Sequence, residues 1–240
     1  MADERDIETR GALRAIVQNA VAQESPLPSE KDLAALLGIG RSSVREALIR
    51  LEAEGFVVRR HGAGTFANPA ALDVAVRIDR TAEYADVLAD AGVAAAVEVL
   101  DARWTTLEAA VAASLRRPVG SRAFVTRKRW LAAGRPVMVA TDVVPAWRAV
   151  EVDPEWSVFA IARALTGRGT DWVSSWIAPV LAGKAAEELG CEPGEPVLHL
   201  EQLGVTRDGT RCWWANELHR PGDLRYGLVR TVAPDSSASS

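Results

Sequence analysis

The sequence predicts an α+β protein with two domains, and three observations support this. All eight tryptophans of the 240-residue chain lie between Trp104 and Trp214, so the composition changes along the chain. Apolar residues near the N-terminus recur at helical spacing until Pro26. From about Ala94 onward, apolar runs alternate with glycine and proline, which is the pattern of strands. Few short helices interrupt these runs, so the second domain is expected to contain a mostly antiparallel sheet.

The strand and helix patterns of the second part can be assigned to ranges. Strands are expected at 94–104, 123–131, 135–145, 171–182, 196–207 and 210–220. Short helices are expected at 81–92, 106–116, 157–165 and 183–190. Asn68 followed by Pro69 favours an extended or turning backbone, which marks a linker. We therefore expect a first domain at 1–68, a linker at 69–80, a second domain at 81–234 and a polar, disordered tail at 235–240.

The composition limits the function classes. The chain is 48% hydrophobic and 25% charged, as globular proteins are. Its apolar runs are far shorter than the roughly 18 residues of a membrane span, and the acidic N-terminus does not resemble a signal peptide. The two cysteines cannot form a disulfide framework or a four-ligand zinc site. We expect a cytoplasmic protein without membrane association, bound metal or cofactor.

A first helix is predicted after Ser29. This serine is a good N-cap, and Asp32 three residues later completes a capping-box pattern. The helix should run to about Leu37, because Gly38 stops it. A second helix is then expected to begin near Arg41 and to end at Gly55.

The second helix has one apolar face and one polar face. Val44, Ala47, Leu48 and Leu51 recur at i, i+3, i+4 and i+7 and should face the core. That spacing turns Ser42, Arg45 and Ile49 outward. Two short helices joined by a glycine-containing turn, with arginine and serine at the start of the second, are typical of a helix-turn-helix.

A β-hairpin should follow these helices. Residues 56–60 have the pattern of a strand, 61–64 that of a tight turn, and Thr65 and Phe66 that of the returning strand. Residues 1–68 carry nine Lys/Arg and ten Asp/Glu, so this domain is not basic as a whole. Any contact with DNA must therefore come from a local patch of arginines. A small helical interaction module with solvated arginines is the alternative.

The residues from Ala12 to Phe66 resemble the winged helix-turn-helix of the GntR family of bacterial transcription regulators. The resemblance rests on the pattern LPSE..LA..LG...R..VR.AL..LE.EG......G.GTF, which this sequence carries. Gly40 departs from it, because the family usually has serine or threonine at the cap of the recognition helix. The resemblance implies DNA contacts from Lys31, Arg41, Ser42, Ser43, Arg45, His61 and Gly62.

The second part of the chain shows no catalytic constellation. The three histidines are scattered, and no metalloprotease, nucleophile-elbow, P-loop or dinucleotide motif is present. The order of its elements resembles the UTRA effector domain of the HutC-like branch of the GntR family, from about Thr81 to Val232. This implies a chorismate-lyase-like α+β fold with a central antiparallel sheet that binds small molecules.

Candidate effector residues follow from strand alternation and from the resemblance. Arg127 and Arg129 should lie on one face of their strand and Lys128 on the other. Paired guanidinium groups suit a phosphate, sulfate or carboxylate. The resemblance adds further effector-binding residues to this pair, namely Asp142, Ser157, Glu217 and Arg220. A solvated strand face or a structural ion pair is an equally good interpretation of each.

Together these observations predict a homodimeric, ligand-responsive regulator that binds double-stranded operator DNA and is not an enzyme. Release of a repressor from an inverted-repeat operator by a small anionic effector is the expected mechanism. The alternative is a lyase-type enzyme on the C-terminal fold with a regulatory N-terminal module. Turnover would need a positioned acid or base, for which Glu217 and Asp142 are the weak candidates.

Overall fold

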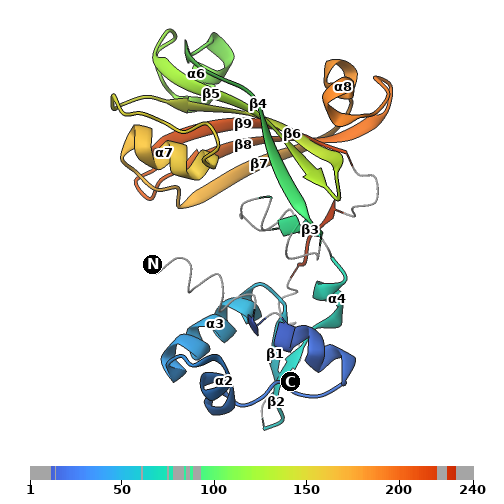
Figure 1. Cartoon of the computed structure of the whole chain (residues 1–240). Coiled ribbons are helices and arrows are strands. Elements are labelled where there is room, and N and C mark those ends of the chain that lie inside the picture. Colours follow the sequence, from blue (N-terminus) through green and yellow to red (C-terminus); the bar gives the residue numbers. More distant parts are fainter. Residues whose placement is uncertain are drawn as a thin grey trace, which may run out of the picture. The chain divides into compact units, whose positions relative to one another are not determined.

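A computed structural model describes residues 12–13, 15–60, 62–74, 76–77, 84, 87–88, 93–220 and 226–230. The chain forms two compact units, Met1–Asp79 with Tyr226–Ser240, and Arg80–Arg225 (Figure 1). The first contains a helix-turn-helix and a two-stranded hairpin, and the second is built on a six-stranded antiparallel sheet. The α+β fold class predicted from the sequence is confirmed.

The first unit is organised around its helices. Residues 12–13 and 15–22 are helical, and α2 (Glu30–Leu37) and α3 (Arg41–Ala53) follow. The predicted cap is present, because the Ser29 side chain accepts a hydrogen bond from the Asp32 backbone N–H. Gly38 ends α2 in the left-handed conformation with φ of +64°, which a side chain would strain. The core of this unit consists of Leu13, Val17, Ala20, Leu27, Leu33, Val44, Leu48 and Val57.

The hairpin forms the expected wing. Strand β1 (Val57–Arg60) pairs antiparallel with β2 (Gly64–Ala67). The backbone N–H of Leu27 donates to the Thr65 carbonyl at 2.7 Å, which ties the wing to the segment before α2. The asparagine side chain of Asn68 donates to the Gly55 carbonyl at 2.8 Å and fixes the chain's exit from the hairpin.

The range 69–80, expected to be a linker, contains regular structure. Its described residues form helix α4 (Pro69–Leu72) and strand β3 (Val76–Arg77). Proline is favourable in the first turn of a helix, where its missing N–H has no partner to lose. Strand β3 pairs in parallel with β10 (Tyr226–Gly227), so the chain returns to its first unit near the C-terminus. The expected tail at 235–240 lies outside the described residues.

The second unit contains the strands predicted from the sequence. Its sheet has the order β4-β5-β6-β9-β8-β7, with every neighbouring pair antiparallel. The strands are β4 (Ala95–Thr106), β5 (Arg122–Ala132), β6 (Arg135–Pro145), β7 (Trp172–Leu181), β8 (Pro196–Val205) and β9 (Arg211–His219). The helices are α6 (Ala109–Leu115), α7 (Val158–Thr166), the 3₁₀ turn η1 (Gly183–Ala185) and α8 (Ala186–Leu189). Of the helix expected at 81–92, the described residues are Tyr84, Val87 and Leu88, which are helical.

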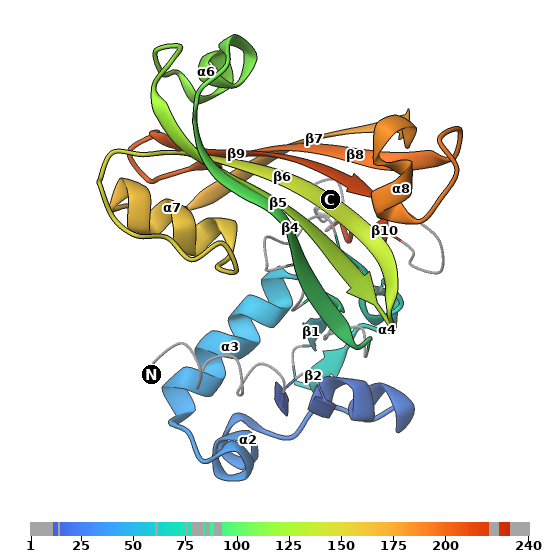
Figure 2. The ribbon, with the colours of Figure 1, turned by 45° about the horizontal axis from the view of Figure 1, so that its top comes forward.

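The helices cover the two faces of this sheet differently. Helix α7 packs on one face, where Ile161 and Leu165 meet Trp213 in a buried cluster. Helices α6 and α8 pack at opposite ends of the other face (Figures 1 and 2). We call these the α7 face and the α8 face. Among the described residues, no helix covers the middle of the α8 face between these two clusters.

A buried tryptophan organises the α7 face. Trp213 is fully buried, and its indole N–H donates to Thr170 Oγ1 at 2.8 Å. Its ring packs over Gly204, where a Cβ atom would stand 2.1 Å from the indole nitrogen. Glycine is therefore required at this point of β8 by the close approach of the ring.

No helix in the described part of the chain is both long and apolar enough to cross a membrane.

Candidate nucleic-acid interface and ligand sites

Helix α3 presents its first turn to solvent. It begins after Gly40, whose backbone is extended and which offers no side-chain cap. Val44 and Leu48 are buried, whereas Arg41, Ser42 and Ser43 are exposed. The inward and outward faces of this helix are those that the apolar spacing predicts.

Arg45 is held in place by an acid from α2. Its Nε and Nη2 donate to Glu30 Oε2 at 3.2 and 3.1 Å. The Arg45 side chain remains 61% exposed. The hydrogen bond from Arg45 keeps the pKa of Glu30 below its ordinary value. Because guanidinium has five N–H donors, both hydrogens of Nη1 and one of Nη2 remain available for another acceptor.

The remaining predicted DNA contacts belong to α2 and to the hairpin turn. Lys31 lies in the first turn of α2 and is exposed. Gly62 lies in the hairpin turn with φ of +73°, a conformation that favours glycine. His61, also predicted from the resemblance, lies outside the described residues.

Two arginines of the wing are engaged within the domain. Arg59 pairs with Glu52 of α3, with Nε and Oε2 3.2 Å apart. The guanidinium of Arg60 lies 4.6 Å from the centroid of the Phe66 ring, on the neighbouring strand. The Arg59–Glu52 pair joins the wing to the recognition helix, whereas the contact of Arg60 with Phe66 lies within the hairpin.

The sheet register decides which candidate effector residues can act together. Arg127 pairs with Thr141, and Thr141 pairs with Asn216, so these three share the α8 face. Lys128 pairs with Ala140, and Ala140 pairs with Glu217, so these lie on the α7 face. The six residues predicted for one effector therefore do not surround one site.

The two arginines of the R-x-R pattern lie on the α8 face and both have acidic partners. Arg127 Nε donates to Glu188 of α8 at 2.9 Å, and its Nη1 donates to Thr141 Oγ1 at 2.6 Å. Arg129 Nε donates to Glu98 of β4 at 2.8 Å. A sheet separates both guanidinium groups from Asp142, Ser157 and Glu217, so one small ligand cannot contact both groups of residues directly.

The α7 face carries a set of buried and half-buried polar side chains. Asp142 is 5% exposed and accepts from Thr126 Oγ1 at 3.1 Å. Glu217 accepts from Gln202 Nε2 at 3.3 Å and lies 2.9 Å from His219 Nε2. Buried polar groups of this kind are costly unless partners satisfy them, and they are concentrated here on one face of a sheet.

Ser157 and Lys128 complete this arrangement. Ser157 caps α7 and accepts from the Ala160 N–H at 3.2 Å. Lys128 is 2% exposed, and its ammonium donates to the carbonyl of Trp156, which precedes the cap. The resemblance did not single out Lys128. Its position opposite Arg127 followed from strand alternation, but its burial is a tertiary property.

Arg220 links the end of β9 to the loop that follows α8. Its Nε donates to Glu195 Oε1 at 2.8 Å, and its Nη1 donates to the Gly190 carbonyl at 2.9 Å. Both partners belong to the connection between α8 and β8. Arg220 thus fastens this connection to the end of β9.

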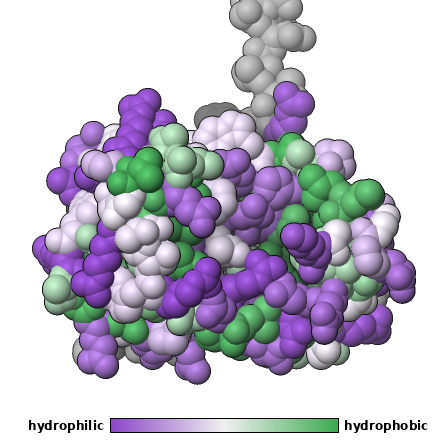
Figure 3. All heavy atoms as spheres, turned by 90° about the horizontal axis from the view of Figure 1, so that it is seen from above, coloured by the Kyte–Doolittle hydropathy of each residue, from purple (hydrophilic) through white to green (hydrophobic). Residues whose placement is uncertain are grey.

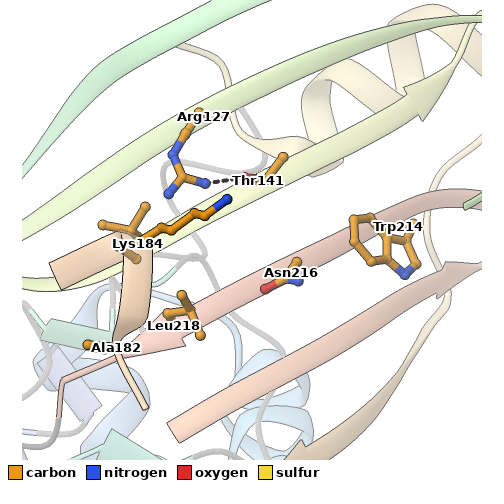
Figure 4. A pocket seen from close by; sticks show the side chains of 9 residues that line it. Arg127, Thr141, Ala182, Lys184, Trp214, Asn216 and Leu218 are labelled. Atoms are coloured by element: carbon orange, nitrogen blue, oxygen red, sulfur yellow. Dashed lines mark hydrogen bonds between the residues drawn. The ribbon is translucent and has the colours of Figure 1, made fainter. Parts of the chain in front are cut away.

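A pocket of about 380 Å³ opens on the α8 face, which is within the range of small-molecule sites. Seen from this side, hydrophilic and hydrophobic residues are interspersed (Figure 3). Figure 4 shows Arg127 and Lys184 reaching into the same space beside Thr141, with Trp214 at the other end. The pocket is lined by Arg127, Val139, Thr141, Ala182, Lys184, Ala185, Trp214, Asn216 and Leu218.

The cysteines have no signs of reactivity. Burial raises the pKa values of both thiols, Cys191 and Cys212, which disfavours the nucleophilic thiolate. Among the residues that the structure describes, no group of three or more His, Cys, Asp or Glu side chains could hold a metal ion.

The comparisons with known proteins agree with this architecture. Residues 12–67 match the model of the bacterial regulatory proteins of the gntR family, and residues 90–224 match the UTRA domain. The chain is 28% identical over 239 residues to the HTH-type transcriptional regulator Rv0792c of Mycobacterium tuberculosis, covering 95% of this chain and 86% of that protein. It is 27% identical to the HTH-type transcriptional repressor NagR of Bacillus subtilis, covering 90% of each.

Solved structures share the fold. PhnF from Mycobacterium smegmatis superposes with a TM-score of 0.59 at 23% identity, covering 87% of this chain and 92% of that chain. The possible transcriptional regulator YydK from Bacillus subtilis superposes with a TM-score of 0.68 at 13% identity, covering 92% and 99%. With a winged helix-turn-helix followed by a UTRA domain that accounts for more than half of its length, the chain belongs to the GntR family of transcription regulators, in its HutC-like branch.

Proposed function

We propose that this regulator acts as a homodimeric repressor that binds an inverted-repeat operator through the start of α3 and is released by a small anionic effector. One observation carries the DNA-binding part of the proposal. Arg45 is exposed at the start of the recognition helix, and Glu30 orients it while leaving N–H donors available. An arginine presented in this way can bind O6 and N7 of guanine in the major groove.

The proposed contacts divide by role. Arg41 and Arg45 lie on the exposed start of α3 and are assigned to base edges or adjacent phosphates. Lys31, Ser42 and Ser43 are assigned to the phosphate backbone, which fixes the register of the helix in the groove. His61 and Gly62 at the wing turn are assigned to phosphates beside the major groove. The NagR relative is named a repressor, which supports the same role here.

The edge strand β7 supports a dimer of this chain. It ends the six-stranded sheet, and large apolar side chains on it are exposed, with Trp172, Trp176 and Leu181 at 55%, 56% and 64%. A long edge strand with exposed apolar residues favours pairing with another strand. We propose that this edge contacts a second copy of the chain, because an inverted-repeat operator requires two DNA-binding domains related by two-fold symmetry.

We assign the effector to the α7 face. Lys128 and the N-terminus of α7 at Ser157 supply positive charge for an acid group, while Asp142 and Glu217 can accept hydrogen bonds from hydroxyl or amino groups. Effector binding would favour a dimer arrangement in which the spacing of the two DNA-binding domains no longer matches the operator half-sites. This mechanism is a shift in population between two arrangements.

The proposal is tested by selecting operator sequences from random duplexes with the full chain, followed by fluorescence-anisotropy titration at several salt concentrations. We expect an inverted repeat with half-sites roughly 34 Å apart. Log affinity should fall steeply with log salt concentration, since phosphate contacts release counterions. Recovery of no enriched motif, together with weak binding that is insensitive to salt, would exclude this function.

A further inference from the structure

The pocket on the α8 face has a charge pattern that points to a ligand of its own. Arg127 of β5 and Lys184 of η1 both extend into it (Figure 4). Glu188 lies four residues after Lys184, a spacing at which opposite charges on a helix can pair. Here Glu188 is instead occupied by Arg127, which donates to both of its carboxylate oxygens.

Lys184 is therefore left without a counter-charge. Within the described ranges, its ammonium group forms no hydrogen bond or ion pair. Arg129 near this end is paired with Glu98, so among the described residues Arg127 and Lys184 share the one carboxylate of Glu188, and Arg127 occupies it. The nearby acceptors Glu188 and Thr141 are already hydrogen-bonded to Arg127. An added anion is the group that this arrangement lacks.

The other lining residues define the rest of the ligand. Asn216, in the middle of the pocket, has a half-buried amide that forms no hydrogen bond in the part of the chain that the structure describes. Trp214 closes the far end and offers a ring face (Figure 4). Its indole N–H donates to Glu201 at 2.9 Å, so negative charge lies at this end. An acid group would therefore lie at the Lys184 end, and a ring or sugar face would lie against Trp214.

We propose that this pocket is a second ligand site, distinct from the α7 face, and that it binds a small organic acid. The carboxylate contacts Lys184 and the free N–H groups of Arg127, a polar group of the ligand contacts Asn216, and its ring packs on Trp214. Because Lys184 and Glu188 both belong to the connection between β7 and β8, an occupant would bind this connection to the central strands. Ligand binding at this site would therefore restrain the connection that follows the edge strand β7.

Calorimetric titration of the full chain tests the site with three probes. Benzoate carries both the acid and the ring, benzamide is its neutral counterpart, and inorganic phosphate is an anion without a ring. We expect benzoate to bind at millimolar concentration, phosphate to bind more weakly and benzamide not to bind. Lys184→Ala should weaken benzoate binding about tenfold, as loss of a charge-assisted hydrogen bond does. Lys184→Arg should retain most of it.

Arg207→Ala is the matched control, because it removes one exposed cation from the far turn between β8 and β9 without touching the pocket. It should leave benzoate binding unchanged. Equal binding of benzoate and benzamide, equal losses in both alanine variants, or no binding of any probe would overturn the proposal. Since none of these measurements involves DNA or the α7 face, failure here would leave the operator titration to decide the proposed function separately.

Discussion

Arg45→Ala is the most direct perturbation of the proposed DNA contact. A bidentate arginine–guanine pair contributes about 1 to 3 kcal/mol of discrimination, which corresponds to a roughly 5- to 150-fold loss of operator affinity. The structure favours the upper part of this range, since Glu30 already holds the guanidinium through two N–H groups and less freedom is lost on binding. Loss of specificity should accompany loss of affinity.

Glu30→Gln separates positioning from contact. It keeps the length of the side chain but removes the charge that orients Arg45. Exposed ion pairs are worth about 0.2 to 1 kcal/mol, so we expect at most a roughly fivefold loss. If the effect of Glu30 runs through Arg45, the double variant Glu30→Gln with Arg45→Ala should bind no more weakly than Arg45→Ala alone.

The assay is anisotropy titration with the selected operator and with a scrambled duplex at one fixed salt concentration. The ratio of the two affinities reports specificity, and Arg163→Ala on α7 controls for the change in net charge. The reasoning is refuted if Arg45→Ala lowers binding to both duplexes equally, because Arg45 would then contact phosphate alone. It is also refuted if the Glu30 and Arg45 effects simply add.

Three further predictions concern stability and assembly. Gly40→Ser should stabilise α3 by a few tenths of a kcal/mol, measured by urea unfolding, because the backbone at Gly40 is extended and a Cβ atom there meets only ordinary contacts. Gly204→Ala should destabilise the second unit by about 1 to 3 kcal/mol in urea unfolding, because the added Cβ would collide with the Trp213 ring. The control Gly194→Ala should have little effect on the same measurement, because its Cβ meets open space. Trp176→Glu on the exposed edge should shift the protein toward monomer in light scattering without changing the circular dichroism spectrum, and an unchanged dimer would place the interface elsewhere.

Local sequence patterns were sufficient to predict the winged helix-turn-helix. Ser29, Asp32 and Gly38 define the ends of α2 through contacts within a few residues, and the apolar spacing of α3 defines its buried face. The pairing of Arg45 with Glu30 was not predicted, because it joins two helices and depends on their crossing geometry. The strands of the second unit were also predictable, since each carries its own apolar pattern between glycines and prolines.

What the sequence by itself determined is the order of elements and the side of a strand to which each residue belongs. Alternation already placed Arg127 and Lys128 on opposite faces of β5. Only the tertiary structure decided what each face meets, because strand order and register bring together residues that are distant in the chain. Lys128 became a buried cation beside α7, whereas Arg127 became part of a pocket with Lys184 of η1. Packing across strands and helices set these surroundings, and no local pattern encodes that packing.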